Sequence, residues 1–183
     1  MRPSVFIIFG ITGDLARRKV LPSLYNLAKD GLLPEPTYLV GTSRRPMDAQ
    51  ALKTEIAEAV QAATGQPANQ AVIDSLQPSM VTLDPAKAED YRGLKDHLEQ
   101  LQVEQRLFYL SIPPEVYGQV VNYLGEQGLN QGPGPVRLLV EKPFGTDLAS
   151  AQALIDLTAK HFTEDQIMRI DHYLAKETAQ NIL

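Results

Sequence analysis

The feature that most constrains the fold is a regular alternation of short apolar runs and longer helical patterns along the 183 residues. The runs are rich in β-branched and aromatic residues and nearly continuous in apolar character, which is typical of strands covered on both faces. The alternation predicts an α/β fold, a doubly wound parallel sheet of about six strands with helices on both sides. The expected strands are Val5–Phe9, Thr37–Val40, Met80–Leu83, Arg106–Leu110, Val136–Val140 and Gln166–Ile170. The expected helices are Asp14–Asp30, Asp48–Thr64, Ala86–Gln100, Glu115–Gln127 and Leu148–His161.

Glycine and capping residues mark several helix ends. Gly31 stands where the C-terminus of the first helix needs a positive φ, and Pro34 follows shortly after. Asp147 is expected to cap the last helix at its N-terminus. The Gly- and Pro-rich stretch Gly128–Pro135 predicts an exposed connector.

Charge and composition exclude several classes of partner. The formal net charge is −5, and the basic residues are scattered, which disfavours a nucleic-acid or anionic-membrane surface. There is no cysteine, so neither a disulfide framework nor thiolate chemistry is available. No apolar run reaches the length of a membrane span, and Val5–Phe9 is too short for the core of a signal peptide. We therefore expect a cytoplasmic protein in which any bound anion is held by a local site.

The segment Gly10–Ala16, GITGDLA, joins the first strand directly to a helix. Gly10 allows a tight turn, Gly13 lets the backbone approach a pyrophosphate, and the helix N-terminus offers free N–H groups to it. The small residue Ala16 permits close helix–strand packing. The pattern is GxxGxxA rather than GxGxxG, and its place after the first strand favours phosphate binding. The alternative is that both glycines serve only the turn. We interpret Asp14 as a first-turn residue stabilised by the helix dipole.

The end of the second strand predicts which dinucleotide is bound. Gly41–Arg45 carries two hydroxyls and two guanidiniums, and no carboxylate follows until Asp48. An acidic residue here would select the ribose 2′-hydroxyl of NAD, whereas arginine accommodates the 2′-phosphate of NADP. The pattern favours NADP, with dual use left open. The alternative is a solvated arginine pair.

Two further segments place charged residues at strand ends. Lys142, in Glu141–Gly145 (EKPFG), should point into the crevice at the carboxyl end of the sheet, and the following proline restricts its backbone. In Arg169–Glu177, His172 and Lys176 are four residues apart and could hold a phosphate together on a helix face. Asp171 could orient a histidine base. A rigid turn with a solvated lysine remains possible for the first segment.

Together, Gly10–Ala16, Glu141–Gly145 and Arg169–Glu177 resemble the GxxGDLA, EKPFG and RIDHYLGKE segments of the glucose-6-phosphate dehydrogenase family. The stretch Leu107–Pro114 is similar to the family's strand and turn before the lysine. The likeness covers nearly the whole chain. It implies oxidation of glucose 6-phosphate at C1 to 6-phosphogluconolactone, in the pentose phosphate pathway, with hydride transfer to NADP.

The resemblance also implies a domain organisation. Residues 1–170 would form a Rossmann dinucleotide-binding domain. Residues 171–183 would begin the segment that leads to an absent C-terminal antiparallel-sheet domain, which carries substrate and dimer contacts in this family. Lys176–Leu183 looks helical and finishes on an uncapped apolar pair, so we expect the chain to stop short of the full enzyme. The full-length family is homo-oligomeric, and this part is expected to lack the dimer interface.

The resemblance assigns roles to individual residues. Arg44 matches the residue at the 2′-phosphate, and Tyr117 matches a tyrosine on the cofactor side. Lys142 matches the lysine shared by nicotinamide and substrate, and Asp171 the partner of the catalytic histidine. No metal is implied. The cofactor loop would be Gly10, Thr12, Gly13, Asp14 and Leu15, and the sugar-phosphate ligands would be His172, Tyr173 and Lys176.

Two departures limit what the chain can do alone. Ala175 stands where the family has glycine, which is costly if that backbone needs a positive φ. The family's general-base histidine belongs to the second domain, and we expect His97 and His161 to be surface residues of helices. Weak cofactor binding and negligible turnover follow. The alternatives are a non-catalytic NADP-binding regulatory module and another Rossmann sugar oxidoreductase.

Overall fold

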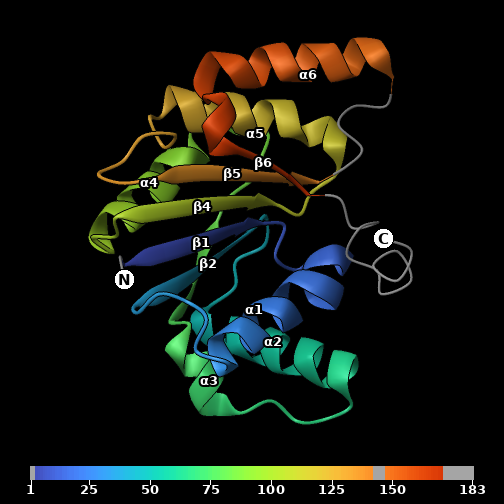
Figure 1. Cartoon of the computed structure of the whole chain (residues 1–183), viewed down its shortest axis with the longest axis vertical. Helices are drawn as coiled ribbons and strands as arrows, with labels where there is room; N and C mark the ends of the chain where they lie inside the picture. Colours follow the sequence, from blue (N-terminus) through green and yellow to red (C-terminus); the bar gives the residue numbers. More distant parts are fainter. Residues whose placement is uncertain (1–2, 142–146, 171–183) are drawn as a thin grey trace.

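The computed structural model describes residues 3–141 and 147–170, which form one parallel sheet with helices on both faces (Figure 1). The strand order is β3-β2-β1-β4-β5-β6, and every neighbouring pair is parallel. The order reverses between β1 and β4, where open α/β sheets bind their ligands. The strands are β1 (Ser4–Phe9), β2 (Thr37–Ser43), β3 (Pro78–Thr82), β4 (Gln105–Leu110), β5 (Val136–Glu141) and β6 (Ile167–Ile170). The predicted doubly wound fold is confirmed.

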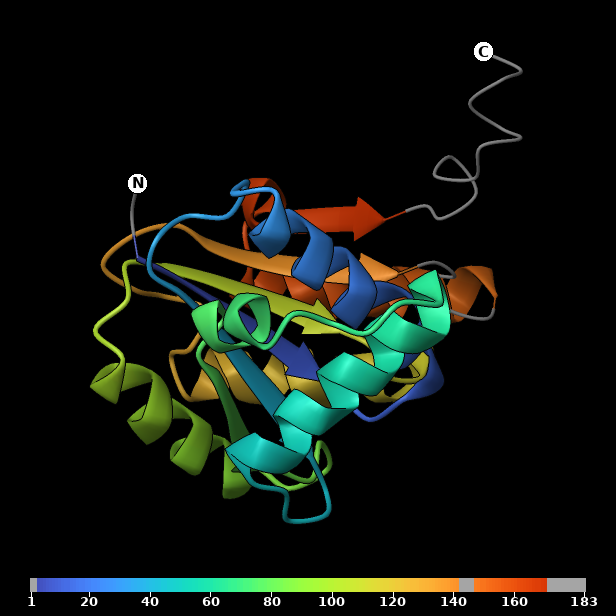
Figure 2. The same ribbon diagram turned by 90° about the horizontal axis from the view of Figure 1, so that it is seen from below.

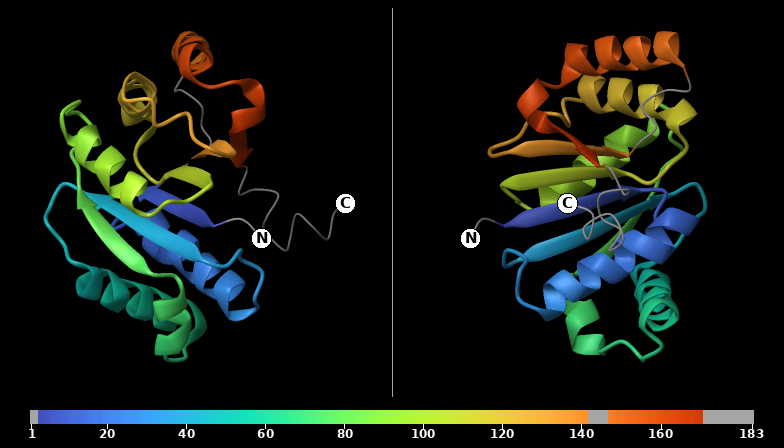
Figure 3. Two further views of the ribbon diagram at one scale, coloured as in Figure 1. Left: turned by 90° about the vertical axis from the view of Figure 1, so that its left-hand side faces the viewer. Right: turned by 45° about the vertical axis from the view of Figure 1, so that its right-hand side comes forward.

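The helices divide between the two faces of the sheet (Figures 2 and 3). The first face carries the π-helical turn η1 (Ala16–Val20), α1 (Leu21–Lys29), α2 (Ala49–Thr64) and α3 (Gln70–Ser75). The other face carries α4 (Asp90–Gln100) and α5 (Pro114–Glu126), with α6 (Leu148–His161) packed on α5. Because successive strand residues point to opposite faces, Ile7 of β1 enters one core and Ile8 the other. Both cores hold the strand ends in fixed positions around β1.

Several local details confirm the predicted helix punctuation. Gly31 has φ +66°, and Gly128, at the start of the predicted connector, has φ +67°. Asp147 caps α6, with its carboxylate accepting the Ser150 N–H at 2.7 Å. Within the described ranges, no helix has the length and apolar character needed to cross a membrane.

Other boundaries differ from the expectation for physical reasons. The helix α3 was not predicted, because six residues give too little apolar periodicity. The helix α4 begins at Asp90 instead of Ala86, since the Asp84 carboxylate accepts the Ala86 N–H at 3.1 Å and turns the chain. Gln166 belongs to the 3-10 turn η2 (Glu164–Gln166), not to β6. The strand β2 extends to Ser43 because its last residues pair with β3.

Candidate functional site

A cleft of about 420 Å³ lies at the carboxyl end of the sheet, where the strand order reverses. Segments that follow β1, β3 and β4, the last residues of β2 and the first turns of α5 all contribute to it. Its lining residues are Gly10, Thr12, Gly13, Thr42, Ser43, Arg44, Leu83, Asp84, Pro85, Ala86, Ser111, Ile112, Pro113, Val116 and Gln119. This volume falls within the usual range for small-molecule and cofactor sites.

The turn after β1 requires glycine. Gly10 has φ +74°, and a Cβ atom there would lie 2.5 Å from the carbonyl oxygen of Ser111 and 2.9 Å from Cγ2 of Ile112. The Gly10 carbonyl accepts the N–H of Gly13 at 2.9 Å, which closes the loop. The backbone therefore passes the end of β4 at a distance that no other residue allows.

The helix that follows this loop opens toward the cleft. Its first backbone bond runs from the Arg17 N–H to the Gly13 carbonyl, 3.1 Å, so the amides of residues 14–16 precede every helical bond. Gly13, whose carbonyl accepts this bond, has no side chain that could cap the helix start. The Asp14 carboxylate is exposed and pairs with Arg18 at 3.5 Å along the helix. Free amides and the positive end of the helix dipole thus remain available to an anion.

The end of β2 brings hydroxyls and one guanidinium to the same cleft. Thr42 is buried, Ser43 is half-buried and Arg44 is exposed, and all three line the cleft. Within the described ranges no carboxylate forms an ion pair with Arg44. Asp48 is instead the N-cap of α2, where its carboxylate accepts the Ala51 N–H at 2.7 Å. The nearest acidic residue after β2 therefore has a structural partner of its own.

The ends of β5 and β6 lie next to each other at this edge of the sheet. Glu141, the last residue of β5, pairs in register with Ile170, the last residue of β6. The Glu141 carboxylate is buried and accepts a hydrogen bond from the Tyr109 hydroxyl of β4. Burial raises the pKa of Tyr109, so its hydroxyl stays protonated and keeps donating at neutral pH.

Residues 7–181 match the family described as "Glucose-6-phosphate dehydrogenase, NAD binding domain". The chain belongs to this family. It is 39% identical to the glucose-6-phosphate 1-dehydrogenase of Chlamydia muridarum, over 99% of this chain and 38% of that protein. It is 41% identical to the glucose-6-phosphate 1-dehydrogenase 2 of Mycobacterium tuberculosis strain H37Rv, over 99% of this chain and 37% of that protein. The chain thus spans less than two fifths of the length of these relatives.

Solved structures of the glucose-6-phosphate dehydrogenase family agree with the fold. A glucose-6-phosphate dehydrogenase in complex with its substrate glucose-6-phosphate superposes with a TM-score of 0.83 at 34% identity, covering 98% of this chain and 38% of that one. The structure of the glucose-6-phosphate 1-dehydrogenase of Mycobacterium avium superposes with a TM-score of 0.82 at 29% sequence identity. The match covers 99% of this chain and 41% of that one. The predicted resemblance and the predicted Rossmann architecture are both confirmed.

The structure separates the residues proposed for the cofactor. Gly10, Thr12, Gly13 and Arg44 meet in the cleft. Asp14 and Leu15 follow them on the helix but are not among the lining residues. Tyr117 of α5 is buried in the core, and its hydroxyl donates to the carbonyl of Leu110, at the end of β4, at 3.4 Å. Burial raises the pKa of Tyr117, so it is a neutral donor.

The residues proposed for the substrate fall outside the described ranges. These are Lys142, Asp171, His172, Tyr173 and Lys176, together with Ala175. Their roles remain predictions. Sequence reasoning also missed cleft residues that the structure reveals, above all Asp84 and Ser111. Asp84 is a single polar residue after a strand, and no motif marks it. Ser111 lies within the stretch Leu107–Pro114, but the likeness of that stretch to the family assigns it no role.

Both described histidines are half-buried, which corrects the expectation that they lie on the surface. His97 of α4 packs toward β3, with Nε2 2.9 Å from the Ser79 hydroxyl, and burial lowers its pKa. His161 of α6 lies against α5, with Nε2 3.2 Å from Oδ1 of Asn122. Neither histidine lines the cleft. Both are held in helix packing, so neither histidine supplies a general base in the cleft.

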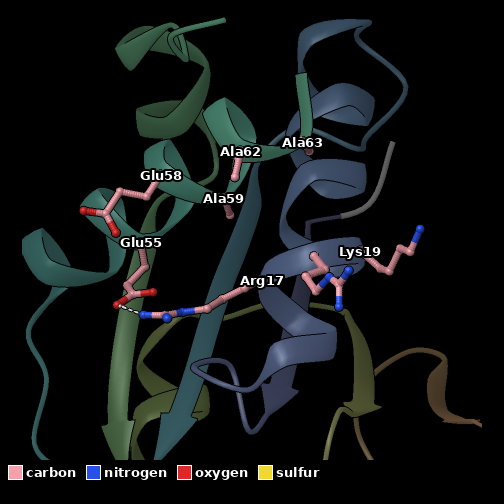
Figure 4. Close-up of a pocket in the computed structure, with 8 residues that line it drawn as sticks. Arg17, Lys19, Glu55, Glu58, Ala59, Ala62 and Ala63 are labelled. Atoms are coloured by element: carbon pink, nitrogen blue, oxygen red, sulfur yellow. Dashed lines mark hydrogen bonds and ion pairs between the residues drawn. The ribbon is translucent and has the colours of Figure 1, made fainter. Parts of the chain in front are cut away.

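A second hollow of about 530 Å³ lies between η1 and α2 (Figure 4). It is larger than the cleft, but acidic and basic residues line it together. Arg17 reaches across to an ion pair with Glu55, and this hydrogen bond raises the pKa of Arg17. Glu58 stands one turn further along α2. Arg17 is thereby paired with a carboxylate, and the mixed charge does not favour an anion in this hollow. The described ranges contain no group of residues suited to hold a metal.

Proposed function

We propose that this chain binds NADP in the cleft and serves as the cofactor-binding part of a glucose-6-phosphate dehydrogenase. The observation that carries the proposal is the meeting of an uncapped helix start, the Gly10 turn and Arg44 around one cavity. The amides of the helix start suit a pyrophosphate, and the glycines let it approach. Arg44 suits a second phosphate group at the end of the neighbouring strand.

The choice of NADP over NAD rests on charge at the end of β2. The Thr42 hydroxyl and the Arg44 guanidinium can donate to a dianionic 2′-phosphate, whereas the Ser43 hydroxyl donates to the Arg45 carbonyl. The carboxylate that would suit an unmodified ribose is absent from this position, because Asp48 caps α2. Asp84 also lines the cleft, but its carboxylate accepts the Ala86 N–H in the turn after β3.

The proposed reaction oxidises the C1 hydroxyl of glucose 6-phosphate to 6-phosphogluconolactone. The bound NADP accepts the hydride from C1, and a base accepts the hydroxyl proton. Lys142 would hold the sugar beside the nicotinamide, and Asp171 would orient the histidine that takes the proton. The sugar phosphate would be held by His172, Tyr173 and Lys176. The adjacency of Glu141 and Ile170 supports this grouping, since Lys142 and Asp171 directly follow them.

The proposed domain boundary follows from the same residues. We propose that residues 1–170 form the dinucleotide-binding domain and that 171–183 begin the segment leading to a substrate and dimerisation domain. Support comes from the greater length of the relatives, of which this chain spans 38% or less in the two proteins compared above. A cytoplasmic location is proposed on the same family grounds.

Substitution of one arginine tests the cofactor assignment. Arg44→Ala is expected to weaken NADP⁺ binding by about tenfold or more, because charge-assisted hydrogen bonds to the 2′-phosphate are lost. NAD⁺ binding should change by less than about twofold, since NAD⁺ lacks that phosphate. Isothermal titration of both nucleotides measures the two effects.

The neighbouring arginine provides the matched control. Arg45 is exposed like Arg44 but does not line the cleft, so Arg45→Ala should leave both affinities unchanged. Equal losses from the two substitutions, or equal losses for NAD⁺ and NADP⁺, would contradict a 2′-phosphate site at Arg44.

The positions of His97 and His161 lead to a prediction of the activity of this chain by itself. Neither His97 nor His161 lines the cleft, so a mixture of this chain, NADP⁺ and glucose 6-phosphate should form negligible NADPH. The absorbance of NADPH follows the reaction directly. Turnover at enzyme-like rates would show that these residues alone complete the site.

A further inference from the structure

The hydroxyl of Ser111 is a buried polar group without a hydrogen-bond partner among the described residues. Ser111 directly follows β4, lines the cleft and is 8% exposed. Its Oγ is buried and has no hydrogen-bond partner in the part of the chain that the structure describes. The backbone N–H of the same residue is used, since it donates to the Phe9 carbonyl at 3.0 Å. Only the side-chain hydroxyl therefore has no hydrogen-bond partner among the described residues.

An unpartnered buried hydroxyl lowers stability, and alanine would fill the same space without that cost. Two other buried polar atoms of the described residues also have no partner, Nε of Arg106 and Oδ1 of Asn130. Both lie toward the amino ends of the strands, near the starts of β4 and β5, whereas the cleft lies at the carboxyl ends. Ser111 differs because it lies in the cleft, beside the turn that the proposed cofactor requires.

The surroundings of Ser111 indicate which part of a ligand it would meet. A Cβ atom on Gly13 would lie 3.0 Å from the Gly10 carbonyl oxygen and 3.5 Å from that of Ser111. Ser111 is therefore close to both glycines of the phosphate loop. Ser111 follows β4, whereas Arg44 follows β2 on the other side of β1. Rotation about its Cα–Cβ bond can swing the hydroxyl between staggered positions.

We propose that the Ser111 hydroxyl is a ligand of the bound dinucleotide, donating a hydrogen bond to an oxygen of the nicotinamide-side phosphate or of the ribose joined to it. The proposal rests on the proposed function of this cleft. The same group lowers the stability of the free protein and strengthens the complex, so its substitution should move the two properties in opposite directions.

The test measures stability and binding for Ser111→Ala. Thermal unfolding without nucleotide should occur about 2 °C higher than in the wild-type chain, because the unpartnered hydroxyl is gone. The dissociation constant for NADP⁺, measured by isothermal titration, should rise about three- to tenfold through loss of one hydrogen bond. Binding of 2′,5′-ADP should not change, since this probe lacks the pyrophosphate and the nicotinamide half.

A second buried serine is the matched control. Ser4, at the opposite end of β1, is 4% exposed, and its hydroxyl donates to Oε1 of Gln105 at 3.4 Å. Ser4→Ala should lower the unfolding temperature, the reverse of Ser111→Ala, and should leave NADP⁺ binding unchanged.

Three outcomes would overturn the inference. The first is NADP⁺ binding by Ser111→Ala equal to the wild type, which would leave the proposed function intact. The second is an equal loss of 2′,5′-ADP binding, which would move the contact to the adenosine half. The third is a lower unfolding temperature for Ser111→Ala, which would mean that the hydroxyl is already used within the fold. A wild-type chain that binds no NADP⁺ would overturn the proposed function as well.

Discussion

Three helix starts in this protein differ in whether a side chain caps them. The helix after β1 and the helices α2 and α6 begin with the same backbone bond. The carbonyl of the first residue accepts the N–H four residues on, at 3.1 Å for Gly13 and Asp48 and at 2.9 Å for Asp147. The carboxylates of Asp48 and Asp147 then accept a second amide, at 2.7 Å in both cases. Gly13 has no side chain with which to do this.

The difference separates stability from binding. A capped helix start satisfies its own amides and gains stability. An uncapped one leaves donors free, and at Gly13 they lie beside a cleft that also contains Arg44. Asp48 and Asp147 do not line that cleft. The protein thus omits a stabilising side chain at the one of these three positions where a ligand phosphate could take its place.

The most damaging way to disturb the uncapped start is Gly10→Ala. The new Cβ atom would meet the Ser111 carbonyl in a backbone with φ +74°, so both sterics and conformation oppose it. We expect a loss of about 2–4 kcal/mol of unfolding free energy and no measurable NADP⁺ binding. Urea unfolding and nucleotide titration measure these effects. Gly31→Ala is a control, because Gly31 also has a positive φ but nothing lies within 4 Å of its Cβ position. Equal destabilisation by both would show that strain alone matters.

A cap added to the uncapped start should weaken binding while sparing the fold. Gly13→Asp would place a carboxylate on the free amides, at the point proposed for the pyrophosphate. We expect NADP⁺ binding to fall about 30-fold or more, with unfolding free energy changed by less than about 1 kcal/mol. The stabilisation from the new cap is offset by crowding, because a Cβ atom on residue 13 would lie 3.0 Å from the Gly10 carbonyl oxygen.

A neutral cap separates charge from bulk at this position. Gly13→Asn keeps the acceptor and the size but carries no charge, so nucleotide titration should show a smaller loss than for Gly13→Asp. Identical losses would mean that repulsion contributes nothing and that close backbone approach alone decides binding.

The reverse experiment removes a cap where no ligand is proposed. Asp48→Ala leaves the α2 amides without their acceptor and should cost about 1 kcal/mol of unfolding free energy. NADP⁺ binding should not weaken, since Asp48 does not line the cleft. Urea unfolding and isothermal titration test both parts. A large loss of affinity would show that Asp48 contributes to the ligand site after all.

Much of this fold could be predicted because its signals are local. The apolar run at Val5–Phe9 predicts a buried strand without knowledge of its neighbours, and the structure moves its start by only one residue. The π-helical turn at Ala16–Val20 and the short helix α3 could not be predicted in this way. Their apolar residues are buried by packing in the core beside β1 and β2, which is a property of the assembled sheet.

The cleft was predicted only where a rule links sequence to strand ends. Gly10, Gly13 and Arg44 follow β1 or β2, and their residue types match a known phosphate-binding logic. Asp84 and Ser111 reach the same cavity because β3 and β4 lie on either side of the β2-β1 pair. That proximity follows from the strand order, which a run of adjacent residues does not reveal.

Acid should weaken a capped helix start in a way that the uncapped one cannot share. Hydrogen bonds from the backbone and side chain of Ser150 hold the pKa of Asp147 below its ordinary value of 3.8. Because the pKa in the folded state lies below that of the unfolded chain, the stabilisation is present above the ordinary value. It is lost as the pH falls through the folded-state pKa. In Asp147→Asn the acceptor remains but no longer titrates, so the wild type should have the higher urea midpoint at pH 7. That advantage should shrink steadily below about pH 4. A difference that grows on acidification would mean that the carboxyl pKa is raised in the folded protein. NADP⁺ binding at pH 7 should be the same for both proteins, because Asp147 does not line the cleft.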